Sequence, residues 1–486
     1  MLFNSNAFLF LFLPIVLLVF FAMASRRGSL ALGWLVVASL FFYGWWNPAY
    51  LGLLCTSTVV GFGLARAAER SRGWMPVGLV FHLGLIGWFK YAGFLSGGLE
   101  QFTGWPVSLA PVALPLAISF FTFQQIAFLV DCSRGRARET RFLHYVLFVT
   151  FFPQLISGPI VHHREMIPQF EGKLRFEWSH FAVGLTFLAI GLFKKTVLAD
   201  GMAAHTSPIY EAAARGTPIG LWAGWTAALG YTLQLYFDFS GYSDMAVGLA
   251  RMFGIRLPLN FHSPLKSQSI IEFWRRWHMT LSRFLRDYLY IPLGGSRRGS
   301  LRRWSNLIVT MLLGGLWHGA SWTFVFWGGL HGVYLVINHA FRALKGRFGL
   351  SRVLPPAVGR PLAVLTTFLA VVVAFVTFRA DDLLVSLSIL TGMAGFRGSA
   401  GRPVEVEAGF WIAALLVIAW GLPNTQQLLR HHDPGIDVYG HLRQKPRLGI
   451  AWQPSPGWAL FTLTVLAAAL FGIMVEGHVE FLYRFF

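Results

Sequence analysis

Two histidines occupy settings that are unusual for imidazole. His278 follows the aromatic and basic run 273–277, and His318 lies in the apolar stretch Leu316-Trp317-His318-Gly319. An ionisable side chain at membrane depth is costly unless it is paired or functional, so His318 is a candidate site residue. Imidazole exchanges protons near neutral pH and therefore suits a general base. The two histidines together predict group transfer from a charged donor inside a bilayer.

The segment 251–303 supplies the positive charge for such a donor. It holds eleven Lys and Arg residues against two acids. Between Ile270 and Tyr290 the apolar side chains recur at helical spacing, which predicts one amphipathic helix lying in the membrane interface with His278 at the edge of its apolar stripe. Guanidinium groups bind phosphates in a planar, bidentate manner. We therefore expect a polyanionic ligand to be held by Arg275, Arg276, Arg283 and Arg286.

Further polar and aromatic side chains are candidates for a supporting role around the two histidines. They are Asp238, Ser240, Tyr242, Trp277, Trp317 and Asn306. A buried Asp238 would either orient an imidazole, bind an arginine, or form a structural ion pair between two helices. The polar run Phe152–Pro159 interrupts an apolar stretch and predicts a broken helix that faces a cavity.

Other histidines are weaker candidates. His331 lies thirteen residues after His318, about 220° around a continuous helix, which predicts packing rather than chemistry. His162 and His163 have no acid or cysteine at ligand spacing, and the two cysteines of the chain stand apart, so no metal site is predicted.

The bulk composition places these residues in a membrane. Of 486 residues, 55% are hydrophobic and 13% are charged, and the mean hydropathy is +0.56, which excludes an ordinary soluble globule. Apolar runs near the length that crosses about 30 Å of hydrocarbon predict roughly 11 transmembrane helices. The runs fall near 7–24, 30–46, 50–65, 76–94, 112–130, 142–160, 179–197, 221–239, 242–256, 304–340, 361–378, 409–422 and 458–475.

The charges indicate how the chain is oriented. The net charge of +19 is spread over loops between apolar runs, which the positive-inside rule explains and nucleic-acid binding does not. Arg26 and Arg27 place the first loop in the cytoplasm and the amino terminus outside. We expect one membrane domain over 1–486, in which 251–303 is cytoplasmic and interfacial. The segment 304–340 is too short for two comfortable crossings, so its middle, at His318, is predicted to turn at membrane depth.

An ordered set of motifs resembles the membrane-bound O-acyltransferase family, and within it the bacterial alginate O-acetyltransferase branch. The motifs are Leu2–Asn6, Phe8–Pro14, Phe152–Ile160, Tyr236–Ala246, Phe273–Ser282, Arg286–Gly295, Leu316–Ala320 and Leu330–Gly332. The resemblance covers nearly the whole chain.

The resemblance implies an all-α bundle of transmembrane, re-entrant and interfacial helices around a through-membrane tunnel. His318 matches the family's catalytic histidine and His278 the second active-site position. Acetyl-CoA would be the donor substrate, its phosphates held by the four arginines named above, and no permanently bound cofactor is implied. Implied partners are periplasmic acetyl-accepting or acetyl-transferring proteins, a polysaccharide acceptor and the lipids of the bacterial inner membrane, with the amino terminus periplasmic.

Other functions remain open at this point. Alginate is the leading acceptor, and cellulose or another cell-surface polymer is an alternative. D-alanyl or lipid acyl transfer by a related branch is a further one. A polysaccharide transporter or flippase would explain the apolar runs and buried acids, but it predicts duplicated halves, and the sequence shows none.

Overall fold

The fold is all-helical, as predicted. The computed structural model describes residues 1–105, 113–138, 141–172, 174–349, 355–398, 406–441, 448–477 and 479–482. Within these ranges no β-strand forms, and the single isolated bridge joins Pro258 to Ile436. The predicted class of an all-α polytopic membrane protein is confirmed.

The described residues of the first half of the chain form twelve α-helices and three π-helical segments. They are η1 (Ala7–Phe12), α1 (Leu13–Ala24), α2 (Gly28–Gly44), α3 (Pro48–Arg70), α4 (Trp74–Ile86), η2 (Gly87–Tyr91), α5 (Ala92–Thr103), α6 (Ile118–Ser133), α7 (Phe142–Thr150), α8 (Phe152–Leu155), α9 (His163–Phe170), α10 (Trp178–Phe193), η3 (Lys194–Ala199), α11 (Asp200–Ala214) and α12 (Leu221–Met252).

The second half continues with short elements and then long helices. They are η4 (Pro264–Lys266), α13 (Ile270–Trp274), α14 (Met279–Leu285), η5 (Arg286–Tyr290), α15 (Gly299–His318), α16 (Trp322–Arg347), α17 (Pro356–Arg379), α18 (Leu383–Met393), α19 (Val406–Gly421), α20 (Thr425–Leu428), η6 (Arg430–His432) and α21 (Pro456–Glu476).

Seven helices among the described residues are long and apolar enough to cross a membrane. They are Ala7–Ala24, Pro48–Arg70, Trp74–Gln101, Trp178–Ala214, Trp322–Arg347, Pro356–Arg379 and Pro456–Val475. Four shorter apolar helices, Gly28–Gly44, Ile118–Ser133, Leu383–Met393 and Val406–Gly421, accompany them. The predicted run 112–130 begins at a residue outside the described ones, and its residues 118–130 lie in α6. The number of roughly 11 crossings stays a prediction.

Helix α12 differs from the prediction, because the two expected runs 221–239 and 242–256 form one continuous helix. The acids that suggested a break are compensated by neighbouring cations. Asp238 lies 2.8 Å from the ammonium of Lys195, and Asp244 lies 2.6 Å from that of Lys194. A paired acid can be buried in a helix without interrupting it. Helices α11 and α18 lie in stretches that the sequence reading left without a helix.

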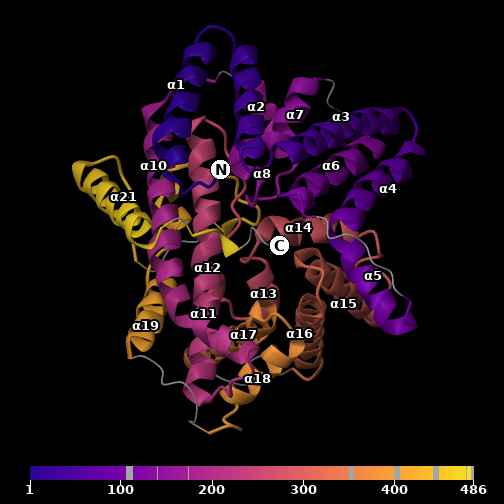
Figure 1. Cartoon of the computed structure of the whole chain (residues 1–486), viewed down its shortest axis with the longest axis vertical. Helices are drawn as coiled ribbons and strands as arrows, with labels where there is room; N and C mark the ends of the chain where they lie inside the picture. The colour runs from indigo at the N-terminus through magenta and orange to yellow at the C-terminus, as the bar shows by residue number, and fades with distance from the viewer. Residues whose placement is uncertain are drawn as a thin grey trace.

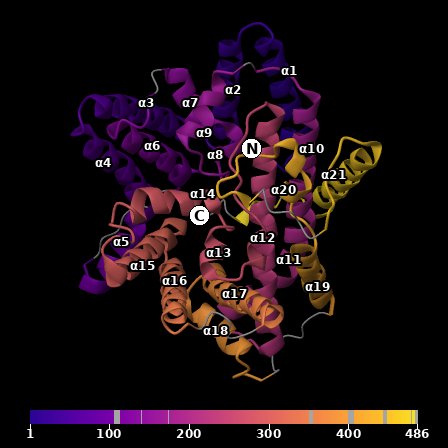
Figure 2. The ribbon, with the colours of Figure 1, turned by 180° about the vertical axis from the view of Figure 1, so that it is seen from behind.

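Helix α12 runs along the middle of the molecule, with α10 beside its upper part and η3 and α11 continuing along the rest of it (Figure 1). A Cβ added at Gly184 would lie 2.6 Å from the carbonyl oxygen of Gly248, so only glycine permits this approach. The amino-terminal helices α1 and α2 lie at one end of the molecule, and α17 and α18 lie at the other (Figures 1 and 2).

Helices α15 and α16 form a tight hairpin that also depends on glycine. A Cβ at Gly315 would lie 2.2 Å from the backbone oxygen of Phe324, and one at Gly328 would lie 2.3 Å from that of Met311. The turn between the helices, residues 319–321, comes directly after His318. The predicted reversal of the chain at His318 is therefore confirmed, and the hairpin fixes its position.

Substitution Gly315→Ala tests this packing. The added methyl group collides with backbone that cannot move without parting the two helices, so we expect a loss of about 1–3 kcal/mol of stability. Gly329→Ala on the same hairpin is the matched control, because its Cβ meets only a Leu312 side-chain atom at 3.4 Å. Thermal denaturation of the purified protein in detergent should show a lower midpoint for Gly315→Ala alone. Equal midpoints would contradict the packing argument.

Candidate active site

His318 is the last residue of α15 and is 3% exposed. Its ring lies among three aromatic rings, with centroid distances of 4.8 Å to Trp317, 5.1 Å to Trp327 and 5.1 Å to Phe378. Helix α15 ends here because Gly319 is extended and Ser321 caps the start of α16, its hydroxyl accepting from the Thr323 N–H at 3.3 Å. The local sequence thus places the imidazole at a helix end inside an apolar cluster.

The end of α15 is held by two residues from η2. The final carbonyls of a helix have no partner within the helix, and in an apolar setting they must find one elsewhere. The ammonium of Lys90 donates to the Trp317 carbonyl and, at 3.2 Å, to the His318 carbonyl, while the Tyr91 hydroxyl donates to the Leu316 carbonyl at 2.8 Å. Lys90 is 9% exposed and lies 5.8 Å from the centroid of the Trp317 ring.

Sequence reasoning missed Lys90. The signal was present, because Lys90 is a lone cation in the predicted span 76–94, and an ionisable residue in such a span is a candidate functional residue. We assign it a positioning role, since it contacts the backbone of His318 rather than the ring.

His278 does not lie on a continuous helix, so the prediction of one amphipathic helix over Ile270–Tyr290 is wrong. The chain forms α13, then a break at 275–278, then α14 and η5. His278 is the residue before α14 and has φ 41° and ψ 53°, a left-handed conformation that is strained for a residue with a side chain. This strain persists because the surrounding contacts fix the residue.

Asn260 provides most of these contacts. Its side-chain oxygen lies 3.1 Å from His278 Nδ1, and it also accepts from the N–H of Thr280 at 3.3 Å and from the Thr280 hydroxyl at 2.9 Å. Its backbone oxygen accepts from the Met279 N–H at 2.9 Å. Because an amide oxygen only accepts, His278 Nδ1 carries the hydrogen and the neutral ring presents Nε2 as the basic nitrogen. Asn260 was not among the predicted site residues.

The structure brings the two predicted histidines to the same indole. The Trp317 ring centroid is 4.8 Å from that of His318 and 6.1 Å from that of His278. His278 is 1% exposed and meets Phe239 edge-on at 4.8 Å. His278, His318 and Trp317 therefore lie together in one buried cluster.

The acid-bearing part of α12 does not join this site as a unit. Phe239 contacts His278, whereas Asp238, about 100° away around the helix, pairs with Lys195 and accepts from the Leu482 N–H at 3.2 Å. Of the three options for Asp238, the ion pair between two helical segments is the one observed. Ser240 is buried in the same helix.

Tyr242 lines a cavity of 450 Å³ that does not include the two histidines, together with Phe3, Trp46 and Ser157. Its hydroxyl oxygen is 3.4 Å from the Ser157 N–H. The predicted broken helix over Phe152–Pro159 is present, because α7 ends at Thr150 and α8 covers only four residues. Its Ile156 and Ser157 line the same cavity, as expected for a broken helix that faces one.

Two further predicted residues have structural contacts. Trp277 packs between Phe261 at 5.0 Å and Phe375 at 5.2 Å, next to the histidines but within an aromatic cluster of its own. Asn306 donates to the Gly295 carbonyl at 3.0 Å, and it lies twelve residues before His318, about 18 Å along α15. The structure therefore does not bring Asn306 to the imidazoles.

The four arginines that were expected to share one ligand are separated by the break at 275–278. Arg275 and Arg276 line a cavity of 1310 Å³, and Arg276 pairs with Glu272 at 2.8 Å. Arg283 forms two hydrogen bonds to the Glu165 carboxylate, and Arg286 pairs with Asp287 at 2.7 Å. A helical wheel drawn through the break had placed all four on one face.

A second basic cavity, of 540 Å³, lies at the end of α14. Its cationic lining residues are Arg134, Arg136, Arg164 and Arg297. Tyr288, Asp131 and His162 also line it and form a hydrogen-bonded cluster. The Tyr288 hydroxyl donates to the Asp131 carboxylate at 2.8 Å and lies 2.7 Å from His162 Nε2. His162 Nε2 is also 3.0 Å from the Asp131 carboxylate. Burial and the Asp131 carboxylate raise the pKa of the Tyr288 phenol, so it keeps its proton at neutral pH.

Asp131 is the acidic partner of His162 and His163 that the sequence spacing did not reveal. Ligand atoms of these three residues lie within 4.8 Å of one another, a spacing that is compatible with a metal. Burial and the neighbouring His162 lower the pKa of His163 to about 3, so its ring is neutral. Hydrogen bonding to Tyr288 accounts for the positions of Asp131 and His162 without an ion.

A row of aromatic rings connects this cavity to the histidines. The centroid distances are 5.1 Å from Tyr288 to Phe284, 4.3 Å from Phe284 to Phe123, and 5.5 Å from Phe123 to Trp317. Phe284 and Tyr288 are one helical turn apart, so the α14–η5 segment supplies one side of the row. Of these four residues, Trp317 alone was among the predicted site residues.

A helical membrane protein with two buried imidazoles and a basic cavity beside them has the features of a membrane-embedded transferase. A family model described as MBOAT, membrane-bound O-acyltransferase family, matches residues 131–352, which include α14, α15 and both histidines. With the relatives described next, this match shows that the chain belongs to the membrane-bound O-acyltransferase family.

The relatives cover most of the chain. A peptidoglycan O-acetyltransferase of Helicobacter pylori is 42% identical over 443 residues, 84% of this chain and 82% of that protein. A probable alginate O-acetylase AlgI of Pseudomonas putida is 41% identical over 502 residues, 99% of each chain. A teichoic acid D-alanyltransferase of Streptococcus thermophilus is 28% identical over 285 residues, 54% of this chain and 68% of that protein. The protein is a multi-pass membrane O-acyltransferase.

Replacement of Lys90 tests how the His318 end of α15 is held. Lys90→Met keeps the length of the side chain but leaves two buried carbonyls without their donor, so we expect a loss of about 1–3 kcal/mol of stability and a large loss of acyl transfer. Tyr91→Phe removes one hydrogen bond to Leu316 and should cost less. Thermal denaturation and transfer assays on the two purified variants compare their losses of stability and activity. A smaller loss for Lys90→Met than for Tyr91→Phe would contradict the assignment.

Proposed function

We propose that the chain transfers acetyl groups from acetyl-CoA for the O-acetylation of an exported polysaccharide. The observation that carries the proposal is the buried pair His278 and His318, which both contact Trp317 and are joined by aromatic rings to a cavity with four arginines. The names of the relatives support acetyl as the group and a polysaccharide as the final acceptor.

His318 acts as the general base in this proposal. An acceptor hydroxyl attacks the carbonyl carbon of the acetyl thioester, and His318 removes the hydroxyl proton as the new C–O bond forms. The C–S bond then breaks, and the imidazolium returns the proton to the thiolate of coenzyme A. The products are an acetyl ester and free coenzyme A, so the reaction balances without an oxidant or a metal. A correctly placed general base contributes roughly 10²–10⁴-fold.

His278 orients the thioester or stabilises the negative charge that develops on its oxygen. The hydrogen bond from Nδ1 to Asn260 fixes the ring plane and the tautomer, as a second residue does for many catalytic histidines. The left-handed backbone of His278 is consistent with strain at a functional position.

The cavity beside Tyr288 is the proposed site for the phosphates of coenzyme A. Four guanidinium groups face a ligand that carries three phosphate groups, and Arg–phosphate pairs are among the strong hydrogen bonds of proteins. Arg283 and Arg286 are already paired with carboxylates. We therefore place the phosphates beside Arg134, Arg136, Arg164 and Arg297 rather than along the α13–α14 segment, with the acetyl end directed toward Trp317.

The acceptor side involves alginate or another cell-surface polymer, reached through periplasmic acetyl-accepting partner proteins. The 42% and 41% identities to the peptidoglycan and alginate relatives are too similar to select a polymer, whereas coverage of 99% of both chains favours alginate. D-alanyl transfer has less support, because that relative shares 28% identity over about half of this chain. We place the protein in the bacterial inner membrane with its amino terminus in the periplasm.

His318→Ala should reduce acetyl transfer by at least 10²-fold, because the hydroxyl would lose its base. The assay follows radiolabelled acetyl from acetyl-CoA into product in inverted membrane vesicles, with the amount of inserted protein measured in parallel. His82→Ala is the matched control, since His82 is a fully buried imidazole in α4, outside the Trp317 cluster. Undiminished transfer by folded His318→Ala would remove His318 from the mechanism.

The donor site is tested by Arg164→Gln and Arg297→Gln. Loss of a charge-assisted phosphate contact should raise the KM for acetyl-CoA roughly tenfold or more, with a smaller change in kcat. With the unmodified protein, acetyl-dephospho-CoA, which lacks one phosphate, should have a higher KM than acetyl-CoA, by less than the increase that the substitutions cause. Arg275→Gln is the comparison variant. A KM that rises for Arg275→Gln and stays constant for Arg164→Gln and Arg297→Gln would return the phosphates to the arginines predicted from the sequence.

A further inference from the structure

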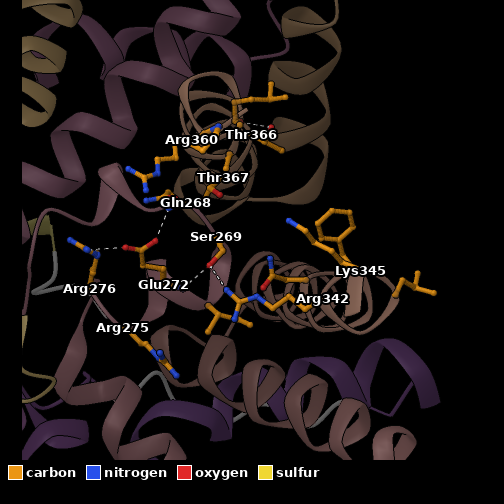
Figure 3. A pocket seen from close by; sticks show the side chains of 18 of the residues that line it. Gln268, Ser269, Glu272, Arg275, Arg276, Arg342, Lys345, Arg360, Thr366 and Thr367 are labelled. Atoms are coloured by element: carbon orange, nitrogen blue, oxygen red, sulfur yellow. Dashed lines mark hydrogen bonds and ion pairs between the residues drawn. The ribbon is translucent and has the colours of Figure 1, made fainter. Parts of the chain in front are cut away.

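The largest of the described cavities, 1310 Å³, is separate from the proposed donor site. It lies between the start of α13, the carboxy-terminal end of α16 and the amino-terminal end of α17 (Figure 3). The cavity beside Tyr288 shares none of its lining residues. The proposed acetyl transfer therefore leaves this cavity unexplained.

The cavity is strongly positive. Its lining includes five cationic side chains and one carboxylate, and these are Arg275, Arg276, Arg342, Lys345, Arg360 and Glu272. The Glu272 carboxylate is already engaged, because it pairs with Arg276 at 2.8 Å and accepts from the Gln268 N–H at 2.8 Å. Within the described residues, the partner to which Arg342 donates is a neutral group, the Ser269 hydroxyl, at 3.2 Å.

Three of the cations have no acidic partner in the described part of the chain. The side chains of Arg275, Lys345 and Arg360 form no ion pair there, and they come from three different elements. Figure 3 shows Arg342 and Lys345 on one side of the cavity and Arg360 on another. Like charges gathered around a cavity repel one another, so an anion that binds there would remove an unfavourable interaction.

The same cavity has apolar walls that face outward. Phe341, Leu344 and Phe348 are 62%, 52% and 65% exposed, and Leu362 on α17 is 49% exposed. The first three recur at spacings of three and four and therefore form one stripe on α16, beside the stripe that carries Arg342 and Lys345. Both α16 and α17 are candidate membrane spans. Side chains of this kind at the end of a spanning helix contact lipid.

We propose that this cavity binds an anionic phospholipid of the surrounding bilayer. Its phosphate-bearing headgroup lies among Arg275, Arg342, Lys345 and Arg360, and its acyl chains follow the stripe on α16. Basic pockets between spanning helices are suited to such headgroups, and each cation near the membrane surface adds to the attraction. The apolar stripe beside these cations favours a ligand that carries its own acyl chains over a free nucleotide or coenzyme A.

The bound lipid would stabilise the segment that leads to His278. Arg342 holds Ser269, which caps α13 by accepting from the Glu272 N–H at 3.2 Å. Helix α13 is five residues long and ends four residues before His278. A headgroup that neutralises the cations around the start of α13 therefore favours the folded position of this short helix.

The test uses the full chain in nanodiscs of phosphatidylcholine with or without phosphatidylglycerol. Native mass spectrometry of the released protein should show retained phosphatidylglycerol, and its presence should raise the midpoint of thermal denaturation. The variant Arg342→Gln/Lys345→Gln/Arg360→Gln should bind phosphatidylglycerol roughly 100-fold more weakly, at roughly fivefold for each charge. Arg347→Gln, which removes a charge from the same end of α16 but does not line the cavity, is the matched control.

The outcomes separate the possible ligands. Retention of phosphatidylglycerol by the triple variant at the level of the control would overturn the proposal. Displacement of the lipid by coenzyme A, or equal stabilisation by inorganic phosphate alone, would show a soluble phosphate site and would also overturn it. If the triple variant does not fold, the single variant Arg360→Gln tests the proposal, because the Arg360 side chain forms no ion pair among the described residues. It should bind phosphatidylglycerol roughly fivefold more weakly, and unchanged binding would overturn the proposal. The lipid readouts do not depend on acetyl transfer.

Discussion

A helix that ends inside an apolar environment must have its last carbonyl groups satisfied, and the position of His318 depends on how this is done. The end of α15 is buried among aromatic side chains, so its carbonyl oxygens require donors from the protein. Lys90 and Tyr91 provide them from a segment more than 200 residues earlier in the chain. Unpaired buried carbonyl groups would be costly, so these hydrogen bonds fix the amino-terminal helices against the end of α15. The position of His318 therefore depends on contacts between distant parts of the chain.

The close packing of α15 against α16 at glycine residues also fixes the position of His318. Close contact of α15 with α16 at Gly315 and Gly328 leaves no freedom for the helix to slide, and the turn at 319–321 then lies where His318 ends α15. His278 is fixed in a different way, by a side-chain amide that accepts from both a ring nitrogen and the following backbone. One imidazole is positioned by helix packing and the other by a hydrogen-bonded, strained turn, and both rings contact Trp317.

Much of this arrangement could be predicted from the sequence, and the parts that could not share a physical cause. Hydropathy and charge located the long helices and the reversal at His318, because membrane thickness and burial of imidazole are strong local constraints. Helical periodicity failed at His278, because the left-handed residue there is stabilised by Asn260, eighteen residues away. The same holds for α12, which stays continuous because Lys194 and Lys195 neutralise acids that appear unpaired in its own sequence. Asp131 reaches His162 only through tertiary packing.

The distribution of arginines illustrates why charge alone did not identify the donor site. In a membrane protein basic residues gather at one surface for reasons of topology, so a basic segment is not itself a binding site. The two basic cavities, beside Tyr288 and beside Arg342, differ in the uncharged side chains that line them. Around Tyr288 the arginines are joined by hydrogen-bonding groups and lie at the end of an aromatic row that reaches Trp317, which suits a polar, phosphate-bearing donor. Around Arg342 they are joined by exposed phenylalanine and leucine on spanning helices, which suits a ligand with its own apolar chains. Two basic cavities with unlike apolar surroundings thus suit different ligands, a soluble phosphate-bearing donor in one and a lipid of the bilayer in the other.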